Sequence, residues 1–350
     1  MTEKKLIVTS EFKFSGPNNV ISSLINGSKC DSLHLTALRK KYSSEYIDSL
    51  EINRNNIHFQ KSNSSLFHII YLIKKLKPIV INTHGIRADI FVFILSFFFN
   101  FKQISTIHNL PDQDYIMRYG YILGKLMLFF HSIIFRSQKV KKIAVSIYSK
   151  KHLISKLSAK NISYIYNGVD SNKYQPSNRF VNNLLPDNKR KKVLFCGHLT
   201  DIKDPISFVK SANLNPDIDY ILLGSGPLES YIKEYNYENV YIIGRVNNVV
   251  DYLNQVDLFV MPSKTEGMPM AFIEAMLMNL PIVCSDIPIF KELSSVQDIS
   301  VLLFKQNDVD DLSLKIRVAL NDKNIKNRAI ALNKFSSFVM AEQYLGVFNE

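Results

Sequence analysis

The sequence predicts an α/β protein with two doubly wound, parallel-sheet domains. Its 350 residues exceed what a single core usually needs. Short apolar, strand-like segments alternate with helical stretches from one end to the other, the pattern of parallel strands joined by crossover helices. A hydrophobic content of 46% and a mean hydropathy of -0.01 are ordinary for a globular chain, which excludes extended disorder.

Each of the two predicted domains begins with an apolar strand, and helices lie between its successive strands. In the first half we expect strands over residues 5–10, 79–83, 103–108, 142–146 and 163–166. In the second half we expect them over residues 192–196, 220–223, 240–243, 258–261, 282–284 and 301–304. The most apolar run, residues 90–101, is shorter than the roughly 20 residues that span a bilayer, so we expect a buried helix there.

The predicted break between the domains begins at Asn167-Gly168-Val169-Asp170. The residues after it are polar and rich in turn formers, which is typical of a domain boundary. We therefore expect a first domain over residues 1–166, a second over 167–335 and a last helix over 336–350, where apolar residues recur at helical spacing. The turn formers are Pro176, Asn178, Asn182, Pro186 and Asn188.

The net charge of +12 and the pI near 9.3 favour an anionic partner, either nucleic acid or a membrane surface. No helix-turn-helix, zinc-finger or RNA-binding signature accompanies the charge, so we expect no nucleic acid. Basic residues instead flank the apolar residues 126–135, which favours an anionic membrane surface over an ordinary solvated helix face. These basic residues are Arg118, Lys125, Arg136, Lys139, Lys141 and Lys142.

The first residues lack the long apolar segment and the cleavage site of a signal peptide, so we expect a cytoplasmic protein, peripheral at the inner face of the membrane. The three cysteines, Cys30, Cys196 and Cys284, are widely separated and have no metal-ligand spacing. We expect reduced thiols and no disulfide.

The segment around Glu266 and Glu274 is the most informative part of the chain. It follows the expected strand at 258–261 and is predicted to form a turn at Gly267, followed by a helix whose first residue is Pro269. The amides at the start of such a helix favour a phosphate or another anion. Two glutamates eight positions apart are often only a solvated helix face, but beside an anion site they suggest nucleotide-sugar binding.

This spacing resembles the paired-glutamate signature of the retaining glycosyltransferases of family four, which have two Rossmann-like domains facing a cleft in the GT-B arrangement. Residues 256–263 and 280–288 are similar to the family's strands on either side of the helix, and the family has a similar Asn-Gly-Val-Asp at the domain crossing. The last helix resembles the one that returns to the N-terminal domain. The resemblance implies an N-terminal acceptor-binding domain and a C-terminal nucleotide-sugar-binding domain.

The resemblance assigns roles around the two glutamates. Glu274 resembles the second glutamate of the family pair, which accepts hydrogen bonds from both ribose hydroxyls, as a carboxylate with two oxygens can. Glu266 resembles the first glutamate, which sits against the donor sugar. The backbone of Gly267, Met268 and Met270 would contact the sugar or its phosphate.

Residues 197–203 resemble the family's Gly-Arg with a lysine five residues after the arginine, two cations that hold the donor diphosphate. Lys203 fits the lysine. His198 stands where the family has arginine, and imidazole lacks the two-pronged donor geometry of a guanidinium. Val246 lies in a segment that resembles the loop whose backbone contacts the nucleobase.

In the first domain the resemblance is thinner. His108 ends a predicted strand, at the edge where open parallel sheets bind ligands, and resembles a family histidine that faces the donor sugar. Taken alone, a histidine at a strand end is somewhat more often structural. His84, one strand away, is a weaker candidate, and Gly16 is the one match to the small glycines of an acceptor or phosphate loop.

Two other motif classes are present in part. The turn at 223–227 has two glycines but lacks the third of a dinucleotide fingerprint, so we do not expect nicotinamide binding. Asp112-x-Asp114 and Asp217-x-Asp219 spell a short motif of metal-dependent transferases, but such triplets often arise by chance. We expect no cofactor and no essential metal.

The resemblance implies a retaining, metal-independent hexosyltransferase in which Glu266, His108 and Lys203 are catalytic. It would move a sugar from a nucleotide diphosphate sugar, with uridine as the expected base, to a carbohydrate or lipid-linked oligosaccharide. The bacterial members suggest O-antigen, capsule or lipopolysaccharide synthesis. The alternatives are a sugar-nucleotide epimerase of the same architecture and a non-catalytic sugar-nucleotide-binding subunit, which His198 favours.

Overall fold

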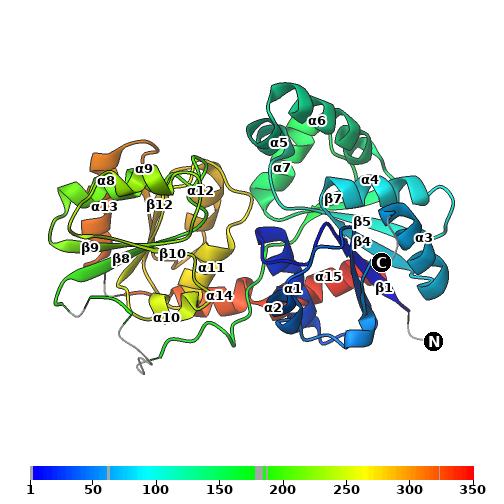
Figure 1. The fold of residues 1–350 in the computed structure, drawn as a ribbon, viewed down its shortest axis with the longest axis horizontal. Coiled ribbons are helices and arrows are strands. Elements are labelled where there is room, and N and C mark those ends of the chain that lie inside the picture. Colours follow the sequence, from blue (N-terminus) through cyan, green and yellow to red (C-terminus); the bar gives the residue numbers. More distant parts are fainter. Residues whose placement is uncertain (1–2, 61–63, 178–183, 187, 323) are drawn as a thin grey trace. The chain divides into compact units, whose positions relative to one another are not determined.

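The computed structural model describes residues 3–60, 64–177, 184–186, 188–322 and 324–350. These form two compact units: Met1–Asp170 together with Ser336–Glu350, called unit 1, and Ser171–Phe335, called unit 2 (Figure 1). Asn178 and Asn182 of the predicted domain break lie outside the described residues.

Unit 1 is a seven-stranded parallel sheet in the order β3-β2-β1-β4-β5-β6-β7. Its strands are β1 Lys5–Thr9, β2 Leu33–Ala37, β3 Ile57–His58, β4 Val80–His84, β5 Lys102–Ile107, β6 Val140–Ala144 and β7 Ile162–Tyr164. Its helices are α1 Gly16–Ser28, α2 Ser44–Asp48, the 3-10 turn η1 Arg54–Asn56, α3 Ser65–Leu76, α4 Ile86–Leu95, α5 Pro111–Tyr119, α6 Tyr121–Arg136, α7 Ile147–Leu157 and α15 Ser337–Asn349.

The central strands of unit 1 are covered on both faces, since every residue of β1, β2 and β4 is buried. The order of the strands reverses between β1 and β4, so the loops after these strands diverge and leave space at the carboxyl edge of the sheet. His84 is the last residue of β4, and His108 follows β5 at the same edge.

The last helix belongs to unit 1, as the predicted fold class requires. Ser337 N–H donates to the carbonyl of Val169 at 2.8 Å, and α15 packs against α1. A Cβ on Gly168 would lie 2.4 Å from the carbonyl oxygen of Ser336, so only glycine allows this approach. These contacts place the division of the chain after Asp170, four residues later than the predicted boundary.

Unit 2 is a six-stranded parallel sheet in the order β10-β9-β8-β11-β12-β13. Its strands are β8 Lys191–Cys196, β9 Ile218–Leu223, β10 Val240–Gly244, β11 Leu258–Met261, β12 Ile282–Ser285 and β13 Val301–Phe304. Its helices are α8 Pro205–Leu214, α9 Glu229–Lys233, α10 Val249–Leu253, α11 Met270–Leu277, α12 Pro288–Ser294, α13 Val309–Ala319 and α14 Asn327–Lys334. Here the order reverses between β8 and β11, so the loops that follow these two strands face the same space.

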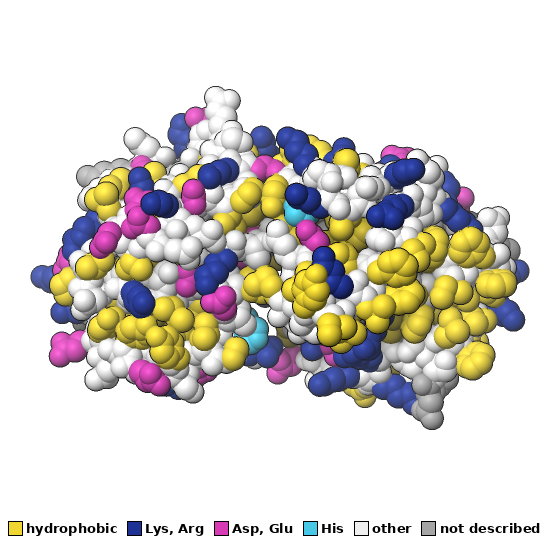
Figure 2. Space-filling model, turned by 90° about the horizontal axis from the view of Figure 1, so that it is seen from above, with side chains coloured by type: hydrophobic (Ala, Val, Ile, Leu, Met, Phe, Trp, Pro, Cys, Tyr) yellow, Lys and Arg dark blue, Asp and Glu magenta, His cyan; other side chains and the backbone are white. Residues whose placement is uncertain are grey.

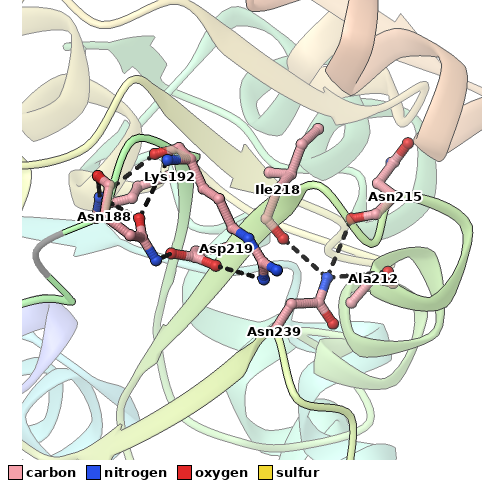
Figure 3. A network of polar contacts seen from close by, with 8 residues as sticks. Asn188, Lys192, Ala212, Asn215, Ile218, Asp219 and Asn239 are labelled. Carbon is pink, nitrogen blue, oxygen red and sulfur yellow. Dashed lines mark hydrogen bonds and ion pairs between the residues drawn. The ribbon is translucent and has the colours of Figure 1, made fainter.

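A network of polar contacts joins β9 to the chain that enters β8 (Figure 3). Asp219, fully buried, accepts a hydrogen bond from Asn188 Nδ2 at 2.8 Å and pairs with Arg190 at 3.5 Å. Asn239 Nδ2 donates to the carbonyls of Ala212, Asn215 and Ile218. The second aspartate of the Asp217-x-Asp219 triplet therefore has a structural role.

Candidate functional site

The loops after β8 and β11 meet at an ion pair between Lys203 Nζ and Glu266 Oε1. Ser263 Oγ donates to the same carboxylate oxygen at 2.8 Å, and the carbonyl of Ser263 accepts from Ser285 Oγ at 2.5 Å. The Glu266 side chain is only 11% exposed and that of Lys203 is 29% exposed. The structure thus brings together two of the predicted residues. Ser263, itself held by Ser285, fixes the carboxylate of Glu266.

Helix α11 begins directly after this loop. Pro269 is its N-cap, in an extended conformation and without a side-chain capping hydrogen bond. Pro269 was expected as the first helical residue, but the helix starts one residue later, at Met270. In the part of the chain that the structure describes, this helix start has no side-chain cap, so its positive end can accept an anion.

Glu274 lies four residues into α11 and is half-buried. Burial raises the pKa of its carboxyl group, while a hydrogen bond from the Tyr174 side chain and the charge of Lys173 oppose that rise. Tyr174 is itself buried, and its carbonyl accepts from Arg328 Nη1 at 2.7 Å. The same Arg328 nitrogen donates to the carbonyl of Leu277, the last residue of α11. Arg328 thereby ties the backbone of Tyr174 to the helix that carries Glu274.

Sequence reasoning missed Tyr174. Its one available signal is an aromatic residue within the polar stretch that marks the domain break. Cys196, at the end of β8, is close enough to Glu274 and Lys203 for both charges to affect the pKa of its thiol. Burial and the nearby Glu274 carboxylate raise the pKa of its thiol to about 12, and Lys203 opposes the shift. The raised pKa keeps the Cys196 thiol protonated and unreactive near pH 7. None of Cys30, Cys196 and Cys284 forms a disulfide.

The loop that carries His198 packs backbone to backbone against the turn after β9. His198 Nδ1 donates to the carbonyl of Ser225, which also accepts from the amide of Leu199 at 3.0 Å. A Cβ on Gly224 would lie 1.8 Å from the carbonyl oxygen of Gly197. Both glycines of the 223–227 turn thus serve this close approach, since a Cβ on Gly226 would lie 2.4 Å from the carbonyl oxygen of Leu199.

Val246 follows β10 and is half-buried. The amide of Gly224 donates to the carbonyl of Gly244 at 2.7 Å, which places the loop of Val246 beside the turn that supports His198. Gly267 and Met268 are buried in the loop before α11. The predicted residues of unit 2 therefore lie on the loops that follow its strands, except Met270 and Glu274, which lie on α11.

In unit 1, the two predicted histidines contact each other. His84 Nδ1 lies 2.8 Å from His108 Nε2, and the rings are stacked with centroids 5.0 Å apart. Gly16 starts α1, and a Cβ there would meet nothing within 4 Å. The loop before it is instead held by buried Asn18, whose side chain bonds Thr9 and the carbonyls of Glu11 and Lys13. Sequence reasoning did not single out Asn18.

The carboxylates of both aspartate triplets have partners within the protein. Asp112 accepts from His152 Nε2 at 2.8 Å, Asp114 pairs with Arg118, and Asp217 pairs with Arg317. Within the ranges that the structure describes, no three His, Cys, Asp or Glu side chains gather as metal ligands would.

Helix α6 is apolar on its outer face. His131 points inward, where its Nε2 lies 3.0 Å from Asp89 Oδ2 and its Nδ1 lies 2.8 Å from the Tyr115 hydroxyl. Ile122 is 85% exposed and Phe129 is 63% exposed. Figure 2 shows hydrophobic side chains gathered on one part of the surface. Further exposed members on α4 to α6 and the residues that follow α4 are Ile94, Phe97, Phe98, Met117, Tyr119, Tyr121, Leu123, Leu126, Phe130 and Ile133.

Two expectations for this region are wrong in part. The run at 90–101 is not a wholly buried helix, because α4 ends at Leu95 and Phe97 and Phe98 are exposed. Lys142 does not flank an apolar surface, because it is fully buried in β6 and donates to the carbonyls of Ser137 and Val140. Lys139, in contrast, lies 4.3 Å from the centre of the Phe97 ring. Among the residues described, no helix is both long and apolar enough to cross a membrane.

Two protein-family models together match most of the chain. Residues 44–173 match the family model of Glycosyltransferase Family 4, and residues 177–334 match that of Glycosyl transferases group 1. The chain is 27% identical to the O-antigen biosynthesis glycosyltransferase WclY of Escherichia coli, over 98% of this chain and 97% of that protein. It is 26% identical to the E. coli UDP-Gal:alpha-D-GlcNAc-diphosphoundecaprenol alpha-1,3-galactosyltransferase, over 79% and 76% of the two chains.

A solved structure supports the same fold. HepE from Anabaena, crystallised in complex with UDP and glucose, superimposes with a TM-score of 0.82 at 17% identity, over 99% of this chain and 100% of that one. At this level of identity the match shows the GT-B fold, with two Rossmann-like domains, and confirms the predicted fold class.

Proposed function

The chain belongs to the family-four glycosyltransferases, and on that basis we propose that it transfers a sugar from a nucleoside diphosphate sugar to a hydroxyl of a carbohydrate or lipid-linked glycan, with retention at the anomeric carbon. Uridine is the base we propose, and O-antigen, capsule or lipopolysaccharide synthesis is the proposed pathway class. The observation that carries the proposal is the Lys203–Glu266 pair beside the uncapped start of α11.

Glu274 is the proposed ribose ligand. A carboxylate can accept hydrogen bonds from two adjacent hydroxyls, which suits a diol. The Tyr174 side chain donates a hydrogen bond to this carboxylate, and burial of Tyr174 limits the freedom of its side chain to move. Binding to a carboxylate that is already ordered loses less conformational entropy than binding to a mobile one.

Lys203 is the proposed diphosphate ligand, supported by its position at the β8 edge. Attraction between opposite charges 4 Å apart is about 4 kcal/mol at the effective dielectric constant near a protein surface, so one lysine can stabilise much of the charge on a leaving phosphate. The backbone of Gly267, Met268 and Met270 adds the positive end of α11. Glu266, held by Lys203 and Ser263, is proposed to face the donor sugar.

The proposed reaction breaks the bond between the anomeric carbon and the leaving phosphate oxygen and forms a bond from that carbon to the acceptor oxygen on the same face. The acceptor proton passes to the leaving phosphate. We propose that Lys203 and α11 stabilise the phosphate charge without a metal ion. Activity that survives removal of divalent cations by EDTA would support that part, and activity that then requires added magnesium would oppose it.

The outer face of α6 is the proposed contact with the inner face of the cell membrane. Its aromatic and aliphatic side chains lie beside Lys125, Arg136 and Lys139, a combination that binds anionic lipid surfaces. Sedimentation with phosphatidylglycerol vesicles should exceed that with phosphatidylcholine vesicles. Ile122→Ser combined with Phe129→Ser should weaken it, while Phe338→Ser on α15, which removes a comparably exposed aromatic side chain, should not.

The test of the enzyme itself is incubation of the purified chain with labelled nucleotide sugars and membrane extract. Lys203→Ala and Glu274→Ala should each lower kcat/KM by about 100-fold or more. Lys233→Ala and Glu229→Ala break an exposed ion pair on α9 and serve as matched controls. Full turnover by the Lys203 and Glu274 variants would refute the site, and conversion of the donor without an acceptor would indicate an epimerase.

One observation favours a second function, that of a non-catalytic nucleotide-sugar-binding subunit. His198 replaces the family's arginine, and its Nδ1 is committed to the carbonyl of Ser225. A neutral His198 therefore offers a bare Nε2 and no donor to a phosphate. Tight binding of UDP with no transfer to any extracted glycolipid would favour this function.

A further inference from the structure

His84 and His108 share one hydrogen bond at the carboxyl edge of the unit 1 sheet. The two nitrogens, His84 Nδ1 and His108 Nε2, lie 2.8 Å apart. One of them must donate and the other must accept, so the state of one ring fixes the state of the other. Asn82 determines which ring donates.

Asn82 Nδ2 donates to the carbonyl of Ile104 at 3.2 Å and to Thr106 Oγ1 at 3.0 Å. A carbonyl oxygen can only accept, so the amide nitrogen must face Ile104 and the amide oxygen must face the other way. That oxygen, Asn82 Oδ1, lies 2.8 Å from His84 Nε2. His84 Nε2 therefore carries a hydrogen.

Both rings are neutral near pH 7. Burial lowers the pKa of His84 well below 6.5, helped by His108, and burial lowers the pKa of His108 to about 4. A neutral imidazole carries one hydrogen, and that of His84 is on Nε2. His84 Nδ1 is thus a bare acceptor, His108 must donate from Nε2, and His108 Nδ1 is left bare.

His108 Nδ1 is buried and has no hydrogen-bond partner among the residues that the structure describes. Buried polar atoms are almost always satisfied, so an unsatisfied one at a candidate site points to a ligand. The ligand atom must be a donor, because the nitrogen can only accept. A hydroxyl group meets this requirement, and a carboxylate or phosphate oxygen does not.

We propose that His84 is a positioning residue which, held by Asn82, locks His108 in the tautomer with hydrogen on Nε2 and a bare Nδ1, so that His108 accepts a hydrogen bond from a sugar hydroxyl. The identity of the hydroxyl as part of a sugar rests on the proposed function; the tautomer does not. His108 then selects sugars that present a hydroxyl at this point and cannot act there as a proton donor.

The tautomer can be measured without any substrate. Two-bond proton–nitrogen NMR spectra of the full chain, labelled with ¹⁵N on histidine, distinguish the two neutral tautomers and the imidazolium. The signals of His84 and His108 are assigned with His84→Asn and His108→Gln. At pH 7 we expect both rings with hydrogen on Nε2. An Nδ1–H tautomer or an imidazolium at His108 would overturn the proposal.

Two substitutions test the role of His84. Asparagine at position 84 can place its amide oxygen where His84 Nδ1 lies, so His84→Asn should preserve the His108 tautomer, whereas His84→Leu should leave His108 as a mixture. His34 and His58 form a matched pair in the same sheet, with nitrogens 3.1 Å apart and rings 5.2 Å apart. His34→Leu is therefore the control and should leave the His108 signal unchanged.

With an active donor, His84→Leu should lower kcat/KM by about tenfold, as expected for the loss of one hydrogen bond, and His84→Asn should restore most of it. A folded His84→Leu protein with an unchanged His108 signal would refute the role of His84. If His84→Leu does not fold, the wild-type and His84→Asn spectra still decide the question. If no nucleotide sugar acts as a donor but the NMR spectra show the predicted tautomers, the proposed function is refuted and the tautomer assignment stands.

Discussion

The substitution Gly224→Ala should disable the donor site without touching a ligand. A Cβ at this position would lie 1.8 Å from the carbonyl oxygen of Gly197, whereas real contacts of this kind stay above 3.0 Å. Relief of this clash requires a shift of at least 3.0 − 1.8 = 1.2 Å, shared between the turn after β9 and the loop after β8. That loop carries His198 and Lys203, and a misplacement of about 1 Å can cost about 100-fold in rate. We expect kcat/KM to fall by about that factor.

Two neighbouring glycines separate the steric effect from backbone strain. Gly224 has φ +135°, so alanine there is strained as well as crowded. Gly244 has φ +85° and open space around its Cβ, so Gly244→Ala adds strain alone, about 1–2 kcal/mol. Gly226 has a Cβ position 2.4 Å from the carbonyl of Leu199 and no positive φ, so Gly226→Ala adds crowding alone.

The measurements are kcat/KM with the active donor and the free energy of unfolding in urea for each variant. Gly226→Ala should share most of the activity loss of Gly224→Ala, because both displace the loop of His198 and Lys203. Gly244→Ala should lose stability but little activity. Near-normal activity in a folded Gly224→Ala protein would show that the loop position does not control the site, and equal losses in all three would attribute the effect to strain.

Three further predictions rest on single contacts. Tyr174→Phe removes the hydroxyl that bonds the Glu274 carboxylate, so the pKa of Glu274 should rise further. The Kd for UDP, measured by calorimetry, should increase about tenfold, as expected for the loss of a hydrogen bond to a charged group. Tyr220→Phe removes another buried hydroxyl of unit 2 and should leave that Kd unchanged. Burial lowers the pKa of Lys142 from 10.5 to about 8, so between these pH values the unfolded state binds more protons than the folded state. As pH rises from 8 to 10.5, the free energy of unfolding of the wild type should therefore increase by up to about 3 kcal/mol relative to that of Lys142→Met. A constant difference between the two proteins would contradict this. His198→Arg should lower the KM for the donor severalfold by supplying two donors to the diphosphate, and a higher KM would show that the Ser225 contact matters more than charge.

The second half of the fold could be predicted from sequence because its signals are local. All six strands expected there are present, within a few residues of the predicted ends. Each is a short apolar run bounded by turn formers, which is the pattern of a buried parallel strand. Lys203 and Glu266 follow such strands closely, so strand order brings their loops to one edge of the sheet, and Glu274 lies on the helix that comes next.

In the first half, two strands were missed. Residues 33–37 read Leu-His-Leu-Thr-Ala, with polar residues in a strand that is nevertheless buried throughout. His34 bonds His58, and Thr36 bonds His68 and the carbonyl of His58. These partners come from β3 and α3, more than twenty residues away, so no local pattern reveals that the polar groups are satisfied inside the protein.

The orientation of α6 depends on a similar long-range contact. The helix is apolar almost all round, so periodicity alone does not identify its buried face. Asp89, fully enclosed on α4, requires a polar partner, and His131 supplies it. At about 100° per residue, Ile122, Phe129 and Ile133 then lie about 160–200° from His131 and must face outward. The apolar outer face of α6 is therefore a consequence of the buried Asp89–His131 pair, and a change that removed this pair would free α6 to turn its aromatic side chains inward.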